Sequence, residues 1–182
     1  TGQLAEDLLK GRALEGVVPG VSGCAGRIVH ALKVTSQPPS RLDPVTVRLV
    51  DLRAQPLHAQ EVIDAVSGPE YGGLNVFLGV VRNHDGGKTV QALEYSAHPT
   101  ALDRLREVAE KVSAEYDAQL AVVHRVGALA IGDIAVALAA AAAHRGQAYE
   151  ASRALIDQLK EQVPIWKHQT FIDGSDEWVG SC

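Results

Sequence analysis

The sequence predicts an α+β fold rather than a doubly wound parallel sheet. Its apolar segments follow the order strand, helix, two strands, helix and then further strands. This order offers few right-handed strand–helix–strand crossovers, the unit from which parallel sheets are built. The chain of 182 residues, 46% of them hydrophobic, is long enough for one domain with its own core and an appendage.

The first half of the predicted domain contains three strands and one helix. Alternating or continuous apolar residues predict the strands, and apolar residues three and four positions apart predict the helix. In chain order these elements are the strand Val45–Val50, the helix His58–Val66, the strand Leu74–Val81 and the strand Val90–Ala97. Leu74–Val81 is an almost continuous apolar run, which predicts a buried strand. It leads to Arg82, and Asp85-Gly86-Gly87 then predicts a turn before the return strand.

The second half predicts two longer helices and two strands. A helix opens at Pro99 and Thr100 and continues to about Tyr116. Residues 119–126 and 134–143 predict strands, and the second of these is rich in alanine. The last helix ends before Pro164, whose ring cannot continue a helix. Its buried stripe is Ala148, Ala151, Ser152, Leu155 and Leu159.

Cationic side chains gather at both ends of this last helix. His144 and Arg145 lie where the alanine-rich strand passes into the helix, and free N–H groups together with the helix dipole favour a phosphate there. Lys160 lies in the last turn and Lys167 lies just past Pro164. Each lysine also has a structural interpretation, in which Lys160 complements the carbonyl end of the helix, while Lys167 and His168 alternate outward on an edge strand. The pattern as a whole predicts an anion-binding catalytic pocket.

The two ends of this helix are too far apart to hold one small anion. Fifteen residues separate Arg145 from Lys160, which corresponds to roughly 22 Å at ~1.5 Å per residue. Either the two groups serve separate sites, or a symmetric dimer brings the start of one helix near the end of the partner's helix. We favour the dimer, because two-fold dimers are the commonest soluble assemblies.

Seven short motifs are spread over residues 77–179. They are Phe77–His84, Val123–Gly127, Gly132-Asp133, Ala143–Arg145, Leu159-Lys160, Pro164–Lys167 and Glu177–Val179. In order and spacing they resemble the large, catalytic subunit of molybdopterin synthase. His-Arg and Trp-Lys pairs are common by themselves, so the resemblance depends on all seven motifs in register. It covers about residues 46–182, and we therefore expect one domain over residues 44–182.

The resemblance implies both a fold and a reaction. The fold would be of the α/β-hammerhead type, with a mostly antiparallel sheet and packed helices. The protein would be a sulfurtransferase of molybdenum cofactor biosynthesis, a homodimer at the centre of a heterotetramer. A small, ubiquitin-like subunit would insert its thiocarboxylated C-terminal tail, and cyclic pyranopterin monophosphate would receive two sulfurs and become molybdopterin. Neither a cofactor nor a metal is expected.

Five residues of this chain match functional positions of that family. Arg82, His144 and Arg145 would bind the substrate phosphate, since a planar guanidinium holds phosphate oxygens with two parallel hydrogen bonds. Lys160 and Lys167 resemble the catalytic lysines. One lysine would act as a general acid or base, and the other would orient the thiocarboxylate or stabilise an oxyanion.

The chain departs from the family pattern after Trp178-Val179. The pattern continues with an arginine that reaches the partner's pocket, whereas here the chain leads to Cys182. We do not expect Cys182 to carry sulfur, because a thiol at a frayed terminus is poorly positioned. Arg125 leads into a glycine turn and is interpreted as structural. Either Arg125, Lys88 or His168 substitutes for the arginine, or this chain binds its pterin more weakly.

Composition argues against several other classes of protein. A formal net charge of −5 argues against nucleic-acid binding, which needs a basic face. The most apolar run, 134–143, is half the length of a membrane span, which needs roughly 20 residues. Cys24 and Cys182 have no second cysteine nearby, so neither a zinc site nor a disulfide framework is expected. No signal peptide is visible, and we expect a cytoplasmic protein.

Residues 1–43 lie outside the resemblance and are expected to form an arm or linker of unassigned function. Within them, Gly20–Arg27 superficially resembles a phosphate-binding loop. Its glycine spacing is one residue too long and the Lys-Ser/Thr pair is missing, so nucleotide binding is not expected.

Two other functions stay open at this point. Another enzyme for anionic substrates, such as a phosphotransferase or a hydrolase, would need a metal-binding carboxylate cluster or a nucleophile beside a base. Neither occurs at convincing spacing. A non-catalytic dimeric scaffold could use Lys160 and Lys167 only to hold the tail of a ubiquitin-like protein or another anionic ligand.

Overall fold

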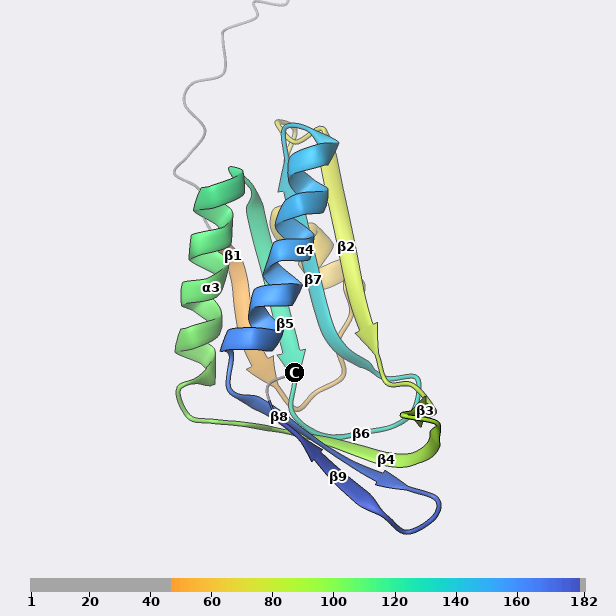
Figure 1. Ribbon diagram of the computed structural model, residues 1–182. Coiled ribbons are helices and arrows are strands. Elements are labelled where there is room, and N and C mark those ends of the chain that lie inside the picture. Colours follow the sequence, from red (N-terminus) through yellow and green to blue (C-terminus); the bar gives the residue numbers. More distant parts are fainter. Residues whose placement is uncertain (1–46, 181–182) are drawn as a thin grey trace, which may run out of the picture. The chain divides into compact units, whose positions relative to one another are not determined.

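The computed structural model describes residues 47–180 of the chain. The predicted arm over residues 1–43, the motif Gly20–Arg27, Cys24 and Cys182 lie outside the described residues. The described residues form three helices, α2 to α4, and nine strands, β1 to β9, which are arranged in two sheets (Figure 1).

The main sheet has four strands in the order β1-β5-β7-β2. These strands are β1 (Val47–Arg53), β5 (Gln119–Arg125), β7 (Ile134–Ala142) and β2 (Gly73–Val80). β1 and β5 run parallel, whereas β5 with β7 and β7 with β2 run antiparallel. The predicted α+β fold, with mostly antiparallel sheet and packed helices, is therefore confirmed.

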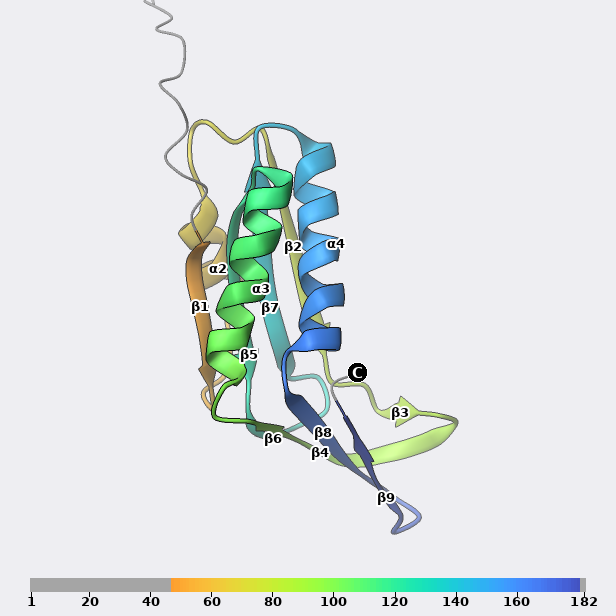
Figure 2. The same cartoon turned by 60° about the vertical axis from the view of Figure 1, so that its left-hand side comes forward.

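Helices cover both faces of the main sheet (Figures 1 and 2). α3 (Ala101–Tyr116) and α4 (Arg145–Gln162) pack on one face, and the shorter α2 (Ala59–Val66) packs on the other. Each helix was predicted within two residues of its observed bounds. Among the helices of residues 47–180, none is long and apolar enough to cross a membrane.

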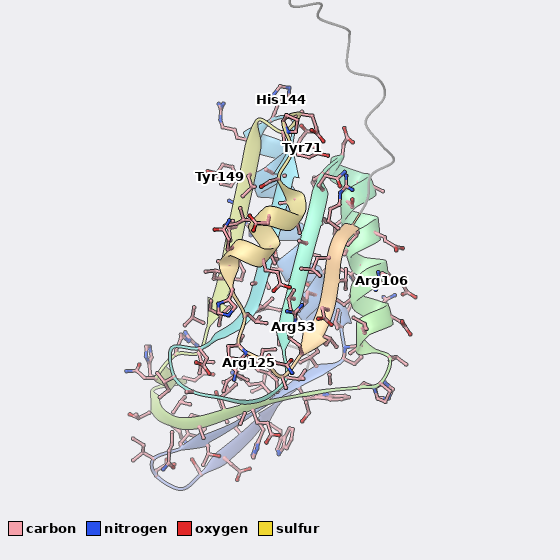
Figure 3. All side chains as sticks on the ribbon, turned by 180° about the vertical axis from the view of Figure 1, so that it is seen from behind. Arg53, Tyr71, Arg106, Arg125, His144 and Tyr149 are labelled. Carbon is pink, nitrogen blue, oxygen red and sulfur yellow. The ribbon has the colours of Figure 1, made fainter. Side chains whose placement is uncertain are left out.

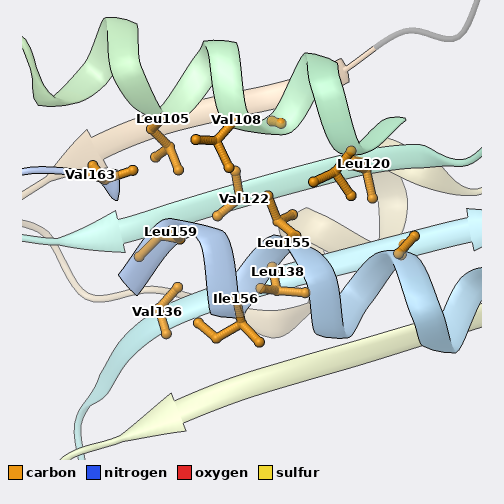
Figure 4. Close-up of a cluster of buried hydrophobic side chains, with 14 of the residues drawn as sticks. Leu105, Val108, Leu120, Val122, Val136, Leu138, Leu155, Ile156, Leu159 and Val163 are labelled. Carbon is orange, nitrogen blue, oxygen red and sulfur yellow. The ribbon is translucent and has the colours of Figure 1, made fainter. Parts of the chain in front are cut away.

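Strand β7 lies between the two helical layers, which explains its run of alanines. Leu138 and Ala140 pack in the cluster formed with α3 and α4, whereas Ala137 and Ala139 pack in the cluster formed with α2. Figure 4 shows the first cluster, in which leucine and valine side chains of both helices fill the space against β5 and β7. A strand that is buried on both faces reads as a continuous apolar run.

A second sheet crosses one end of the main sheet (Figure 1). Its strands, in order, are β3 (His84–Asp85), β4 (Lys88–Ala97), β8 (Ile165–Phe171) and β9 (Asp176–Val179), and β6 (Gly127–Leu129) pairs with β4. The sequence pattern does not predict β3 and β6, because two- and three-residue strands leave no periodicity. β3 and β4 follow β2 along the chain, and β8 follows α4, so functional segments from both halves meet here.

Strand β2 lies at the edge of the main sheet, and the prediction of a buried strand over Leu74–Val81 is wrong for the single chain. Its exposed apolar side chains are Leu74, Phe77, Leu78 and Val80, with exposed fractions of 43%, 37%, 37% and 49%. Val76 packs against α2, but this helix of eight residues is too short to cover the whole strand. A continuous apolar run indicates that both faces of the strand are buried in the assembled protein. It does not show whether the same chain or a partner buries them.

Helix α4 ends where the sequence predicted. After Gln162 the chain turns to extended backbone at Val163, with φ −90° and ψ 121°, and Pro164 follows. The chain then enters β8 at Ile165. This short reversal places the last turn of α4 beside the first residues of β8.

Candidate active site

A pocket of about 340 Å³ opens where the end of α4 meets β2, β4 and β8. Apolar side chains, among them Val136, Ile156 and Leu159, form part of its wall. The charged and polar side chains that also line it include Arg82, Asp85, His124, Lys160, Lys167 and Gln169. An apolar pocket with a few convergent polar groups is the usual form of a small-molecule site.

Both lysines that the sequence analysis singled out line this pocket. Lys160 lies in the last turn of α4 and is exposed. Lys167 lies on β8 opposite Tyr95 of β4, and its side chain is only 16% exposed. Strand alternation turns Lys167 and Gln169 to the pocket and His168 to the other face. The interpretation of Lys167 as pointing outward from an edge strand is therefore wrong, because β8 lies between β4 and β9.

Arg82 lines the same pocket at its exposed rim. It follows the end of β2 closely, and its side chain is 65% exposed. The guanidinium donates a hydrogen bond of 3.0 Å to Oδ1 of Asp85. The fold thus brings together Arg82, Lys160 and Lys167 from three separate elements.

Asp85 belongs to the pocket, although its sequence pattern indicates only a turn. It ends β3, just before Gly86-Gly87, whose φ values of 54° and 80° confirm the predicted glycine turn. Its carboxylate accepts a hydrogen bond of 2.8 Å from Lys167 and one of 3.0 Å from Arg82. The hydrogen bonds from Lys167 and then Gln169 lower the pKa of Asp85 to about 2. Asp85 is therefore an anion at neutral pH.

Gln169 of β8 supports this carboxylate from below the surface. The residue is 2% exposed. Its Nε2 donates to Oδ2 of Asp85 at 3.0 Å and to Oε2 of Glu177 at 3.3 Å. Because an amide nitrogen carries two hydrogens, these contacts use both of them. No sequence motif marks Gln169, since Asp85 lies 84 residues away along the chain.

His124 lines the pocket from β5 and is 6% exposed. Its Nδ1 lies 2.8 Å from the carbonyl oxygen of Arg125, and its ring packs edge-on against Tyr95. A carbonyl oxygen only accepts, so Nδ1 carries the proton and Nε2 is the acceptor. Burial, together with the nearby charge of Lys160, lowers the pKa of His124 to about 4, although the hydrogen bond to Arg125 acts in the opposite direction.

The buried His124 gives the fold a defined sensitivity to acid. The unfolded chain binds a proton at this side chain near pH 6.5, whereas the folded protein binds it only near pH 4. We therefore expect the free energy of unfolding to fall as the pH is lowered from 6.5 to 4, with this residue adding up to about 1.4 kcal/mol per pH unit. Urea unfolding at several pH values will measure it. In His124→Gln the free energy of unfolding should depend less on pH between 6.5 and 4. An unchanged pH dependence would contradict the role given to His124.

A matched control for this experiment is His58→Gln. His58 is exposed and precedes α2 without a side-chain cap hydrogen bond. Its replacement is expected to leave the pH dependence of the free energy of unfolding as it is in the wild type, because this side chain lies exposed on the surface.

His144 and Arg145 lie at the opposite end of α4, outside this pocket. α4 begins at Arg145, His144 precedes it as the N-cap, and both side chains are exposed. Figure 3 shows His144 at one end of the main sheet and Arg125, which follows the pocket residue His124, at the other. A single chain therefore does not bring these two residues to Lys160, in agreement with the separation expected from the helix length.

Glycines hold the turn at His144 and Arg145 against the start of β2. A Cβ atom on Gly73 would lie 2.8 Å from the backbone of Arg145, and one on Gly72 would lie 2.6 Å from the carbonyl oxygen of Ala143. Side chains at these positions would force the backbones apart. Backbone packing thus fixes where these two side chains are presented.

The three cations considered as substitutes for the missing arginine have other partners. Arg125 forms an ion pair with Asp133 at 2.7 Å and Lys88 forms one with Asp173 at 3.6 Å, while Nε2 of His168 lies 3.1 Å from Oδ2 of Asp176. Arg125 also donates to two backbone carbonyls, those of Ala54 and Ala128. These contacts agree with a structural role for Arg125, and compensation by any of the three residues stays a prediction.

Known proteins resemble this chain in sequence and in fold. The family described as MoaE protein matches residues 52–162. The molybdopterin synthase catalytic subunit 1 of Mycobacterium tuberculosis is 44% identical over 141 residues, which span 73% of this chain and 89% of that protein. The crystal structure of molybdopterin synthase from Staphylococcus aureus is 32% identical, with a TM-score of 0.68, over 72% of this chain and 96% of that chain.

A more distant likeness involves a two-component assembly. It is the complex of subunits 1 and 2 of the molybdopterin-converting factor from Helicobacter pylori. The matched chain is 22% identical, with a TM-score of 0.55, over 71% of this chain and 88% of that chain. At this identity the likeness is one of fold alone.

Proposed function

The chain belongs to the MoaE protein family, and from this premise we propose that it is the catalytic subunit of a molybdopterin synthase. It transfers two sulfurs to cyclic pyranopterin monophosphate, and a small, ubiquitin-like subunit supplies them as a thiocarboxylate on its C-terminal glycine. The observation that carries the proposal is the convergence of Arg82, Lys160 and Lys167 on one pocket. The resemblance first inferred from seven motifs is confirmed as a family relationship.

The cations of the pocket suit a substrate that gains charge as it reacts. The pterin carries a phosphate, and opening of its cyclic phosphodiester adds negative charge. Preorganised ammonium and guanidinium groups stabilise such charge where it develops. Arg82 lies at the rim, where a phosphate can reach it. Lys160 and Lys167 line the same pocket and serve the acid–base and oxyanion steps of sulfur transfer.

The apolar part of the wall strengthens these charges. Leu159, Ile156 and Val136 are each less than a tenth exposed and border the pocket. A wall of this kind excludes water from the reacting groups. Electrostatic interactions between charged groups are stronger there, because the dielectric constant is lower than in water. The wall also protects a thiocarboxylate from hydrolysis before the sulfur has moved.

We infer that a second copy of the chain completes each site. His144 and Arg145 are exposed, held in place by Gly72 and Gly73, and remote from the pocket of their own chain. A two-fold dimer would bring them to the partner's pocket as further phosphate ligands. The exposed apolar side chains of β2 favour association, since an uncovered apolar strand is normally buried against a partner.

The small subunit and the cellular location belong to the same proposal. The fold relative from Helicobacter pylori forms a complex of two subunits, and we propose an analogous heterotetramer around the dimer of this chain. A location in the cytoplasm stays a prediction.

The direct test is reconstitution of sulfur transfer. The purified chain is mixed with a thiocarboxylated small subunit and cyclic pyranopterin monophosphate, and the pterin is followed by mass spectrometry. We expect a product with two added sulfurs, and none when the small subunit carries an ordinary carboxylate. If a competent small subunit binds but no sulfur reaches the pterin, the proposed function is wrong.

A further inference from the structure

The pocket proposed to bind an anion contains an anion of its own. Asp85 accepts hydrogen bonds from Lys167 and Arg82, two of the three cations that line the pocket within a single chain. Oδ2 faces Lys167 and Gln169, and Oδ1 faces Arg82. The carboxylate thus occupies the coordination that a phosphate would use, so it is more than part of a turn.

The two pocket lysines differ in their partners. Lys167 is 16% exposed and lies 2.8 Å from Asp85, whose side chain is 28% exposed. For Lys160 no carboxylate of residues 47–180 lies within ion-pair distance, and the side chain is exposed. A half-buried ammonium needs such a counter-ion, because an unpaired charge is costly away from water. Lys160 is therefore free to meet an incoming anion, whereas Lys167 is held in one place.

Gln169 makes this arrangement rigid. It is almost fully buried on β8, two residues from Lys167, and donates to the same carboxylate oxygen that faces the lysine. Asp85 in turn stands at the end of the short β3–β4 hairpin, paired in register with Lys88. The β3–β4 hairpin and Gln169 of β8 therefore hold the Asp85 carboxylate in place, and this carboxylate positions the Lys167 ammonium.

We propose that Asp85 is a positioning residue, which holds the Lys167 ammonium and the Arg82 guanidinium in place and competes with the incoming substrate anion for both. The inference rests on the proposed function for its kinetic part, since Lys167 acts there on the sulfur-transfer step. Asp85 touches no reacting atom and works through the two cations. Its removal should therefore slow the chemistry and at the same time tighten the binding of anions.

This opposition between rate and binding gives the test. For Asp85→Asn we expect kcat of sulfur transfer to fall about tenfold, because Lys167 is no longer aligned. The KM for the pterin and the Kd for inorganic phosphate, measured by calorimetry, should both fall severalfold, because the competing carboxylate is gone. Asp85→Glu retains the charge and should keep the phosphate affinity close to that of the wild type.

Asp176→Asn is the matched control. Asp176 lies on β9 of the same sheet and pairs with His168 on the face opposite the pocket. Its replacement removes one negative charge, as Asp85→Asn does, and should leave kcat, KM and phosphate affinity within about twofold of the wild type. Equal effects of the two variants would reduce the role of Asp85 to net charge and overturn the proposal.

A second readout does not depend on sulfur transfer. Acetylation by the N-hydroxysuccinimide ester of acetic acid, quantified by peptide mass spectrometry, reports how firmly each lysine is held. Lys167 should react severalfold faster in Asp85→Asn than in the wild type, whereas Lys160 should react at the same rate in both. If the wild type transfers no sulfur, the proposed function is wrong. Lysine labelling and phosphate titration still test whether Asp85 holds Lys167 in place and competes with anions. Unchanged labelling of Lys167, or weaker phosphate binding by Asp85→Asn, contradicts the inference.

Discussion

Replacement of Lys167 by alanine is expected to reduce sulfur transfer at least about 100-fold while leaving the small subunit bound. The side chain enters the pocket from β8, opposite Tyr95, and is held against Asp85 at 2.8 Å. Loss of a positioned acid, base or oxyanion-stabilising group typically costs two or more orders of magnitude in rate. The rate is measured by single-turnover formation of the dithiolene, and binding of the small subunit by calorimetry. A modest change in Kd together with a large loss of rate identifies a catalytic lysine.

The same variant separates an enzyme from a scaffold. If Lys167 only held the carboxylate of a ubiquitin-like tail, Lys167→Ala would lose the partner, and any residual rate would recover at high partner concentration. Lys111→Ala is a suitable control, because Lys111 is an exposed lysine on α3, outside the pocket. It should change neither rate nor binding, whereas full activity of Lys167→Ala would remove the lysine from the site.

Mixing two inactive variants is expected to restore about one quarter of the wild-type activity. Arg145→Ala and Lys167→Ala homodimers should each be nearly inactive, because every site in them lacks one cation. After subunit exchange half of the dimers are mixed, and one of the two sites in each mixed dimer combines an intact Lys167 with the partner's intact Arg145. Activity therefore returns only if the two residues act in one site from different chains.

A second mixture tests this geometry further. Lys160 and Lys167 line one pocket within the same chain. A mixture of Lys160→Ala with Lys167→Ala should therefore stay inactive, since each site of the mixed dimer lacks one lysine. Recovery in this second mixture, or none in the first, would contradict a site shared between two chains.

Local sequence patterns predict most helices and strands of this fold. Pro164 marked the end of α4, and the run Asp85-Gly86-Gly87 marked the turn before β4, because these residues act on the backbone nearest to them. The failure at β2 has a different origin. Whether Leu74 and Leu78 are buried depends on what covers the edge of the sheet, which a linear pattern does not contain.

The site was predicted only in part for the same reason. Arg82, Lys160 and Lys167 were found through motifs, and the structure gathers them around one pocket. Asp85 and Gln169 were not recognised, because their contacts connect segments more than eighty residues apart. Ion pairs of this kind arise from strand register, and register across two distant strands cannot be read from local periodicity.

The length of helix α4 also restricts which insertions and deletions the sequence can tolerate. With Arg145 at its first residue and Lys160 in its last turn, the helix acts as a fixed spacer between two chemical centres in the dimer proposed above. Inserting or deleting one residue would rotate one end against the other by about 100° and shift it by ~1.5 Å. Substitutions at exposed positions such as Arg153 and Asp157 leave this spacing unchanged, whereas an insertion or deletion between the two ends does not.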